Sequence, residues 1–284
     1  MFTPDLLVGQ TFLVTGGGSG LGRAMAMRFA SLGAKVAICG RRREPLAATV
    51  DDIRAAGGIA ACGIADVRDP AMVAAMVDSV EAELGPLTGL VNNAAGNFLS
   101  AAEDLSPNAF DTVIKIVLNG TFHTTTEVGR RWIDRKTPGV ILSIVTTYAW
   151  MGSAFVLPSA CAKAGVLAMT RSLAVEWATY GIRSNAIAPG PFPTEGAFSR
   201  LMAGNIEEEV LKQIPAGRFG RPEELADLAA YMMAPGSSYM TGECVVLDGG
   251  EWLKAGQEFG SYTNYPREIV KQMFGAMRPG KKGS

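Results

Sequence analysis

Short apolar runs alternate along this chain with longer stretches in which apolar residues recur at helical spacing. The short runs predict strands, and the periodic stretches predict helices. The predicted strands are Thr11–Thr15, Lys35–Cys39, Ile59–Ala65, Gly89–Asn92, Val140–Val145, Arg183–Ile187 and Cys244–Leu247. The predicted helices are Leu21–Ser31, Glu44–Ala56, Pro70–Leu84, Ser106–Arg135, Pro158–Thr179 and Pro222–Met233.

The order of these elements predicts the fold class. Strands that are apolar on both faces and separated by helices indicate a parallel sheet covered on both sides. We therefore expect a doubly wound α/β fold of the Rossmann type, as a single domain over residues 1–284. Ser106 is the expected N-cap of the long helix, with Pro107 at its first position. Residues 189–222 and the tail 251–284 follow neither pattern, and the first of these is long enough to be a substrate lid.

Composition excludes several classes of protein. The chain has 284 residues, of which 48% are hydrophobic, and a net charge of −1, unlike the strongly basic surface of a nucleic-acid binder. No apolar run approaches the roughly 18 residues of a membrane span, and the acidic Asp5 near the N-terminus argues against a secretory leader. Four scattered cysteines favour a reduced, cytoplasmic protein. His123 is the only histidine, which argues against a Ser-His-Asp triad and a metal site.

A glycine-rich loop follows the first predicted strand and runs directly into a helix. Glycines permit a tight turn and close approach of the backbone to a pyrophosphate, and the helix start offers free N–H groups. This context predicts a dinucleotide site rather than an ordinary turn. The candidate residues of the loop are Gly16, Gly18, Ser19, Gly20 and Leu21.

The end of the second predicted strand indicates which nucleotide binds. An acidic residue there would bind the ribose of NAD, but the chain has Arg41 and Arg42, whose guanidinium groups suit a 2′-phosphate. We therefore expect NADP(H), although a solvated basic turn would have the same sequence. After the third strand, Asp66 and Val67 are placed to meet the adenine, and Asp66 could equally cap the next helix.

Taken together, these residues resemble the short-chain dehydrogenase/reductase family over about residues 10–250. The stretches that carry the resemblance, in the order of the family, are Thr15–Gly22, Asn92–Gly96, Asn119, Lys163, Pro189–Gly190 and Asp248–Gly250. The resemblance implies that Lys163 binds the nicotinamide ribose and that Asn119 bends a helix and anchors a water. It also implies a homotetramer, built on the two long helices. Further cofactor residues implied in this way are Asn93, Ala94, Ala95, Pro189, Gly190 and Phe192.

Two positions depart from the family pattern. Ser159 lies where the family usually has its catalytic tyrosine, four residues before Lys163, and Thr146 lies where it usually has a serine. Tyr148 follows the fifth strand instead. This arrangement resembles the 2,4-dienoyl-CoA reductase branch of the mitochondrial type, as do the stretches Asn92–Phe98, Leu105–Ala109, Ile116–Thr121, Pro158–Val166 and Gly196–Leu201.

The branch implies a role for each candidate. Tyr148 and the side-chain amide of Asn97 would donate hydrogen bonds to the substrate oxygen, and Ser159 would help to hold the ribose or nicotinamide. A dienoyl thioester accepts hydride at a remote alkene carbon, and its negative charge spreads to the thioester oxygen. The donor therefore acts several bonds from the hydride, which explains a displaced tyrosine. The acyl-CoA residues implied by the branch are Arg68, Phe98, Ser106 and Arg200.

Other functions remain open from the sequence. Tyr148 could be a surface phenol, Asn97 could satisfy a turn, and Arg68 and Arg200 could be solvated charges. A 3-oxoacyl or trans-2-enoyl thioester reductase is the alternative enzyme, and a silent NADP(H)-binding protein is the alternative outside catalysis. Glu195, where the family often has lysines, leaves an acyl-carrier-protein thioester or a short acyl group as possible substrates.

Overall fold

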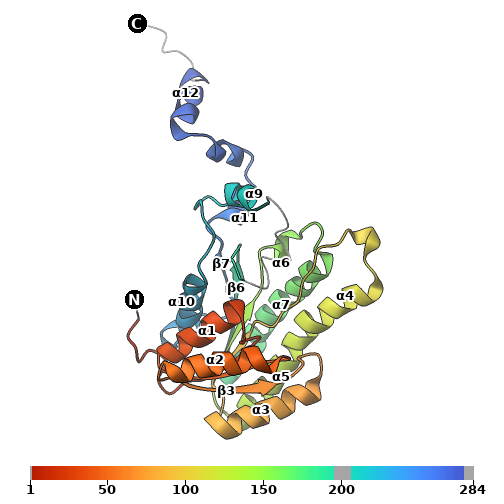
Figure 1. The fold of residues 1–284 in the computed structure, drawn as a ribbon, viewed down its shortest axis with the longest axis vertical. Coiled ribbons are helices and arrows are strands. Elements are labelled where there is room, and N and C mark those ends of the chain that lie inside the picture. The colour runs from red at the N-terminus through yellow and green to blue at the C-terminus, as the bar shows by residue number, and fades with distance from the viewer. Residues whose placement is uncertain (1, 195–205, 278–284) are drawn as a thin grey trace.

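Seven parallel strands form one sheet in the computed structural model, which describes residues 2–194 and 206–277 (Figure 1). The order across the sheet is β3-β2-β1-β4-β5-β6-β7, so the chain moves outward from β1 in two directions. The strands are β1 Thr11–Thr15, β2 Lys35–Gly40, β3 Ile59–Ile64, β4 Gly89–Asn92, β5 Gly139–Ile144, β6 Ile182–Pro189 and β7 Cys244–Leu247. The predicted doubly wound α/β fold is confirmed. All the carboxyl ends of the strands meet at one edge of the sheet.

Helices cover both faces of this sheet because consecutive strand residues point in opposite directions. Phe12 and Val14 of β1 belong to one core and Leu13 to the other. The main helices are α1 Gly20–Ser31, α2 Arg43–Ala55, α3 Pro70–Leu84, α4 Pro107–Ile114, α5 Gly120–Arg135, α7 Leu157–Glu176 and α10 Pro222–Met233. Helices α1, α2 and α10 pack on the first core, and α3 and α5 on the second. Within the described ranges, no helix combines the length and apolarity needed to cross a bilayer.

The long helix predicted over 106–135 is interrupted. Helix α4 ends at Ile114, a π-helical turn η2 follows at Lys115–Asn119, and α5 continues from Gly120. The start of α4 agrees with the sequence: Ala109 N donates to Ser106 Oγ over 3.2 Å, and Pro107 is the first helical residue. The single long helix was therefore wrong in its middle and right at its ends.

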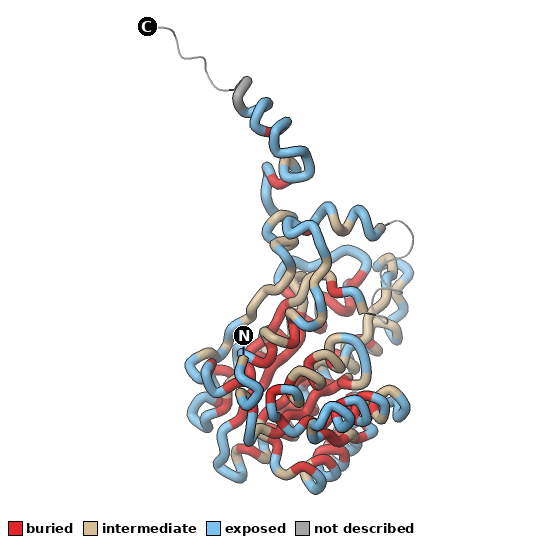
Figure 2. Tube along the Cα trace, turned by 60° about the vertical axis from the view of Figure 1, so that its left-hand side comes forward, coloured by how far each residue is buried: buried red, intermediate tan, exposed pale blue. Residues whose placement is uncertain are grey.

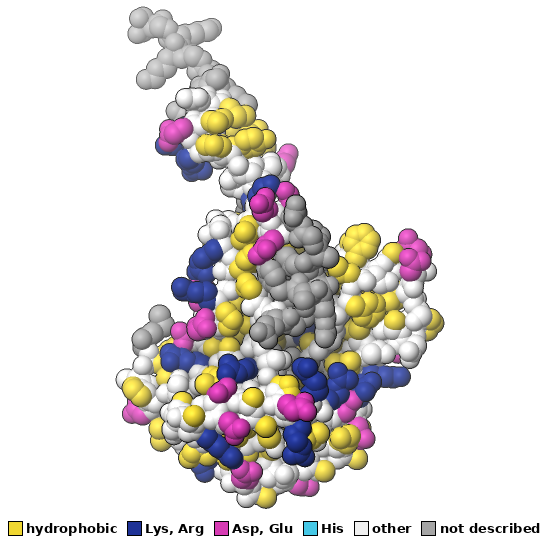
Figure 3. All heavy atoms as spheres, viewed as in Figure 1, with side chains coloured by type: hydrophobic (Ala, Val, Ile, Leu, Met, Phe, Trp, Pro, Cys, Tyr) yellow, Lys and Arg dark blue, Asp and Glu magenta, His cyan; other side chains and the backbone are white. Residues whose placement is uncertain are grey.

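Two segments expected to be irregular contain helices. Helix α9, Ile206–Gln213, lies within the expected lid, and the tail forms α11 Glu251–Ala255, the 3-10 turn η5 Gly260–Asn264 and α12 Arg267–Met277. Helix α12 projects from the body of the molecule, as the ribbon and the tube both show (Figures 1 and 2). Hydrophobic side chains gather on this projection (Figure 3). Arg200 and the other residues of 195–205 lie outside the described residues.

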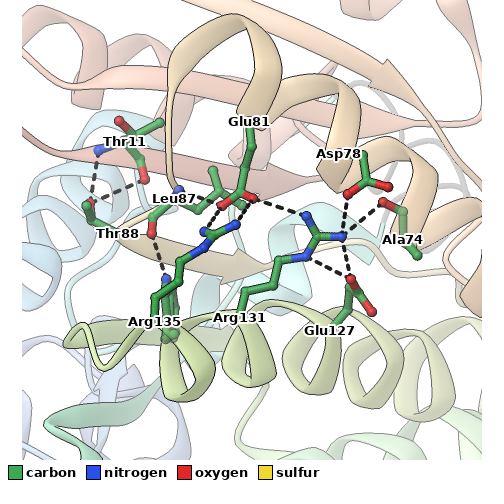
Figure 4. A network of polar contacts seen from close by, with 10 residues as sticks. Thr11, Ala74, Asp78, Glu81, Leu87, Thr88, Glu127, Arg131 and Arg135 are labelled. Carbon is green, nitrogen blue, oxygen red and sulfur yellow. Dashed lines mark hydrogen bonds and ion pairs between the residues drawn. The ribbon is translucent and has the colours of Figure 1, made fainter.

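A polar network joins α3 to α5 at the amino end of β4 (Figure 4). The carboxylate of Glu81 accepts hydrogen bonds from Arg131, from Arg135 and from the backbone N of Leu87, at 2.6–3.1 Å. Trp132 Nε1 donates to Leu87 O over 2.6 Å beside it. The network fixes the two helices on the face of the sheet, far from the edge where the strands end.

Candidate active site

The glycine-rich loop connects β1 to α1 at the carboxyl edge of the sheet. Gly16 adopts a φ of +67°, in the left-handed region that favours glycine. A Cβ on Gly22 would lie 2.3 Å from Gly16 O, so only glycine permits this approach of helix to loop. Ser19 is the N-cap of α1, and its side chain caps no backbone group. The loop therefore presents a hydroxyl and a helix N-terminus of the kind that binds phosphate.

Thr15 and Asn93 fasten this loop to the end of β4. Thr15 Oγ1 accepts from Asn93 N and Ala94 N, each over 3.0 Å. Asn93 Nδ2 donates back to Thr15 O over 3.0 Å. Asn93 thus holds the loop through its side chain, a role that the sequence had not indicated.

A pocket opens beside the loop and gathers candidates from the ends of four strands. Its lining includes nine of the expected cofactor residues: Gly16, Gly18, Ser19, Arg41, Arg42, Asp66, Val67, Ala94 and Ala95. It also includes residues that the sequence did not single out: Cys39, Gly40, Pro45, Leu46, Ala65 and Ile116. These six lack polar side chains, so no chemical signal distinguished them from core residues. This lining brings the glycine-rich loop together with the two arginines that follow β2.

Arg68 forms an ion pair within this region rather than standing free. Its guanidinium donates to both carboxylate oxygens of Asp66, at 2.5–3.0 Å. The Arg68 hydrogen bond lowers the pKa of Asp66, with a smaller contribution from the charge of Arg41. Because Arg68 is 40% exposed, the pair is weak enough for a ligand to compete for either partner.

Tyr148, Ser159 and Lys163 come together at the end of β5. Tyr148 begins a four-residue helix, α6 Tyr148–Met151, instead of lying in an open loop. Its hydroxyl lies 3.0 Å from Ser159 Oγ, and Ser159 is buried on the first turn of α7. Lys163, one turn later, is 6% exposed, and its Nζ donates to Ile144 O. The phenol thus contacts the serine that lies where the family usually has its tyrosine.

Burial lowers the pKa of Lys163 to about 8. Among the described residues, the acceptor of its ammonium group is Ile144 O, which leaves donor capacity for further hydrogen bonds. The ribose hydroxyls of a dinucleotide could accept these further hydrogen bonds from the Lys163 ammonium.

Thr146 lies two residues before Tyr148, and Asn97 lies in the loop after β4. Thr146 Oγ1 is buried and has no hydrogen-bond partner among the described residues. Buried hydroxyls are nearly always bonded, so an unpaired one at a strand end is suited to a bound ligand. Asn97 Oδ1 accepts from Phe98 N over 2.9 Å, which leaves the Nδ2 end of the amide to donate. Phe98 packs against the core cluster that contains Ala149 and Ala162.

Asn119 ends the π-helical turn that interrupts the predicted long helix. Its side chain is exposed, on the last residue of the π-helical turn. Val117, two residues earlier, is buried in one core cluster with Ala162 and Val166 of α7. The face of the turn that meets the helix of Lys163 is therefore apolar, and the water-anchoring role of Asn119 stays a prediction.

The remaining expected residues have simpler surroundings. Gly190 N donates to Leu247 O over 3.0 Å, directly after Pro189 ends β6. The Phe192 ring is 8% exposed and packs on Gly220, which leaves only its backbone for a cofactor. Ser106 is exposed and acts as a helix cap. Leu21 packs against the core. In the parts of the chain that the structure describes, no three His, Cys, Asp or Glu side chains form a metal-binding group.

A parallel sheet with a glycine loop at its carboxyl edge defines a nucleotide-binding protein of the Rossmann type. The sequence comparison is more specific: residues 16–251 match a family model described as enoyl-(acyl carrier protein) reductase. The chain belongs to this family, a division of the short-chain dehydrogenases/reductases, and is an oxidoreductase.

Relatives and solved structures agree with this assignment. An uncharacterized oxidoreductase of Caenorhabditis elegans is 54% identical over 87% of this chain and 81% of its own. A probable (3E)-enoyl-CoA-producing 2,4-dienoyl-CoA reductase of the same organism is 48% identical, covering 86% and 81%. A probable (2E)-enoyl-CoA-producing one of Bacillus subtilis is 46% identical, covering 86% and 97%.

Among solved structures, a short chain dehydrogenase from Bacillus anthracis has a TM-score of 0.79 and 43% identity, covering 86% of this chain and 96% of its own. A gluconate 5-dehydrogenase from Burkholderia cenocepacia in complex with NADP and tartrate has a TM-score of 0.83 and 30% identity, covering 88% and 98%.

Proposed function

We propose that this protein reduces a conjugated enoyl thioester with NADPH, and that its substrate is a 2,4-dienoyl-CoA. The observation that carries the proposal is the contact of Tyr148 with Ser159 above the buried Lys163. In a carbonyl reductase the tyrosine would be at position 159, whereas here the phenol is at 148. A displaced donor suits a substrate whose oxyanion forms several bonds away from the carbon that accepts the hydride. Two similar relatives bear the name 2,4-dienoyl-CoA reductase, which supports the same substrate class.

Tyr148 and Asn97 would act on the thioester oxygen. When bound, NADPH would supply a hydride to a remote alkene carbon, and the electron pair of the diene would move toward the thioester oxygen. The Tyr148 hydroxyl and Asn97 Nδ2 donate to that oxygen where the negative charge develops. Each such donor contributes roughly 2.7–4 kcal/mol to the transition state. A proton then adds to carbon, which gives an enoyl-CoA and NADP⁺.

Lys163, Ser159 and Thr146 would orient the nicotinamide half of the cofactor. Lys163 offers donors to the ribose hydroxyls, and its charge favours the negative transition state. The buried Thr146 Oγ1, which has no hydrogen-bond partner in the described ranges, follows β5 as Tyr148 does. We assign no role to Asn119, because its side chain is exposed.

Arg41 and Arg42 support NADPH rather than NADH. Both side chains are exposed at the mouth of the pocket, beyond the end of β2, where a 2′-phosphate would project. No acidic residue occupies the strand end that would bind an unmodified ribose. The further residues proposed to contact the substrate are Phe98, Ser106 and Arg68. Arg68 would first have to release Asp66, its ion-pair partner.

The test is NADPH oxidation with 2,4-hexadienoyl-CoA by wild type and by Tyr148→Phe. Loss of one oxyanion donor should lower kcat by about 10²–10³-fold. Tyr180→Phe is the matched control, because that phenol is 50% exposed on a distant 3-10 turn. NADH in the same assay should be a poorer reductant. No turnover by wild type, or full turnover by Tyr148→Phe, would reject the proposal.

A trans-2-enoyl thioester reductase is the second candidate, favoured by the description of the matching family. A crotonyl thioester has its oxyanion nearer to the reacting carbon than a dienoyl thioester. Crotonyl-CoA, crotonyl-acyl carrier protein and acetoacetyl-CoA in parallel assays therefore distinguish the candidates. Higher kcat/KM for either crotonyl thioester would replace the dienoyl assignment. NADPH binding without turnover of any thioester would indicate a binding protein.

A further inference from the structure

Two indole rings meet across the carboxyl edge of the sheet. Trp150 belongs to α6, two residues after Tyr148, and Trp252 belongs to α11 in the C-terminal segment. Their ring centroids are 5.5 Å apart and their planes are 86° apart, an edge-to-face contact. Neither residue was singled out in the sequence, because a lone tryptophan carries no motif.

The position of this contact follows from the strand order. Strand β6 lies between β5 and β7, α6 follows β5, and α11 follows β7 (Figure 1). The Trp150–Trp252 pair therefore spans the end of β6, where Pro189 and Gly190 lie. A Cβ on Gly190 would be 2.6 Å from Asp248 Cβ and 3.2 Å from Glu251 Oε2, so the β7 end lies directly against this loop.

The backbone holds both indoles in place. Asp248 Oδ2 accepts from Trp252 N, and Asp248 Oδ1 accepts from Gly250 N, each over 2.8 Å. Trp150 N donates to Thr147 O over 3.3 Å at the start of α6. On the other side of Tyr148, Ser100 N donates to Phe155 O over 2.9 Å, which joins the Asn97 loop to the segment after α6. These hydrogen bonds fix the backbone on both sides of Tyr148.

We propose that the Trp150–Trp252 pair is the distal wall of the acyl pocket and restricts the enzyme to short acyl chains. The inference rests on the proposed function. With the thioester oxygen at Tyr148 and Asn97, the reacting carbons extend toward the end of β6, and the chain beyond them meets the indoles. A longer chain must separate two rings held by α6 and α11. Removing either ring opens apolar space in its path.

The first test is a ratio of kcat/KM for 2,4-decadienoyl-CoA over 2,4-hexadienoyl-CoA. Each additional methylene that becomes buried is worth up to about fourfold, so Trp252→Ala and Trp150→Ala should each raise the ratio by tenfold or more. Trp252→Phe keeps an aromatic edge and should raise it less. Tyr265→Ala, a 58% exposed aromatic of the same tail, should leave the ratio unchanged. An unchanged ratio in the folded Trp→Ala and Trp→Phe variants would overturn the inference.

The second test needs no turnover. Trp132 and Trp177 are 1% and 8% exposed, whereas Trp150 is 39% exposed, so acrylamide should quench mainly the pair. With NADP⁺ present, hexanoyl-CoA should protect the pair from quenching, and decanoyl-CoA should bind at least tenfold more tightly to Trp252→Ala than to wild type. If a thioester protects the tryptophans from quenching but is not turned over, the proposed function is rejected and the role of the pair as the pocket wall is retained. No protection by either thioester, or equal decanoyl-CoA affinity, would reject the wall.

Discussion

At the scale of single residues, the Lys163 ammonium determines how the site responds to pH. It is buried beside one carbonyl, and burial lowers its pKa from 10.5 to about 8. Below pH 8 the ammonium is charged in both the folded and the unfolded chain, and the folded chain bears the cost of its burial. Between about pH 8 and 10.5 the unfolded chain binds more protons, so stability rises with pH. Activity should instead fall over this range, because the charged ammonium is the form that binds the cofactor ribose and favours the negative transition state.

We therefore expect kcat/KM for NADPH to fall as pH rises through about 8. This parameter reports ionisations of the free enzyme. In Lys163→Arg the residual activity should lose this alkaline limb, since a guanidinium stays charged. Tyr148→Phe should keep the limb at lower overall rate. A wild-type profile that stays flat to about pH 9.5 would show that Lys163 titrates elsewhere.

The sequence predicted much of the site, but it could not establish which way each side chain points. Tyr148, Ser159 and Lys163 were expected together, and the structure brings the first two within 3.0 Å. The exposed position of Asn119 could not be predicted, because nothing in the residue types marked the π-helical turn that it ends. Trp150 and Trp252 are 102 positions apart, and only the fold reveals their contact.

At the scale of elements, the charge network between α3 and α5 contributes to stability. The Glu81 side chain is 9% exposed. Burial alone would raise its pKa, but hydrogen bonds from Arg135, Leu87 N and Arg131 outweigh this and lower the pKa to about 2. The lowered pKa means that Glu81 stabilises the fold above about pH 4.5 and loses this effect as pH falls toward 2.

Glu81→Gln should destabilise the protein by about 2 kcal/mol at pH 7, below the roughly 3–5 kcal/mol of a fully buried pair because Arg135 remains hydrated. Urea unfolding gives the free energy directly. The difference from wild type should shrink between pH 4.5 and 2. Glu83→Gln is the control: the Arg54–Glu83 pair is more than half exposed, so its loss should change stability little. Equal effects of the two variants would contradict this account.

The strands were easier to predict than the tail. Their apolar runs are short and continuous, and all seven were located. Helix α12 was missed although its apolar residues have helical spacing, because it is short and lies in a tail rich in glycine and polar residues, which was treated as irregular. Ile269, Met273 and Phe274 on this helix are 37–46% exposed.

At the scale of the whole molecule, the projecting tail contributes little to the body. Within the described residues, α12 packs mainly on η5, through the edge-to-face contact of Phe274 with Tyr262. Helix α1, which follows the glycine loop, and helices α6 and α7, which carry Tyr148 and Ser159, all lie in the body (Figure 1). The tail segment before α12 still matters, because α11 carries Trp252.

Truncation after Tyr265 should therefore leave NADPH affinity unchanged and shift the unfolding temperature by less than about 4 °C, the effect of roughly 1 kcal/mol in a chain of this size. Differential scanning calorimetry and nucleotide titration measure the two quantities. Truncation after Gly249, which also removes Trp252, should cost more. A large loss on removing α12 alone would mean that its apolar face is covered by a second copy of the chain.

The wider π-helical turn η2 sets the rotation of α5 relative to α4 about the helix axis. Each of these helices must direct a particular face toward its neighbours. An α-helix rotates by about 100° per residue, and a π-helical turn rotates by less. The five π-helical residues therefore change the direction in which the side chains of the following helix point. Before the turn, the helix presents apolar side chains to α7. After it, Thr124 and Thr125 of α5 bond the amide of Asn92, at the end of β4, over 2.6 and 2.8 Å. Deleting one residue here would rotate every later side chain away from its partner, so this short stretch tolerates substitution far better than a change of length.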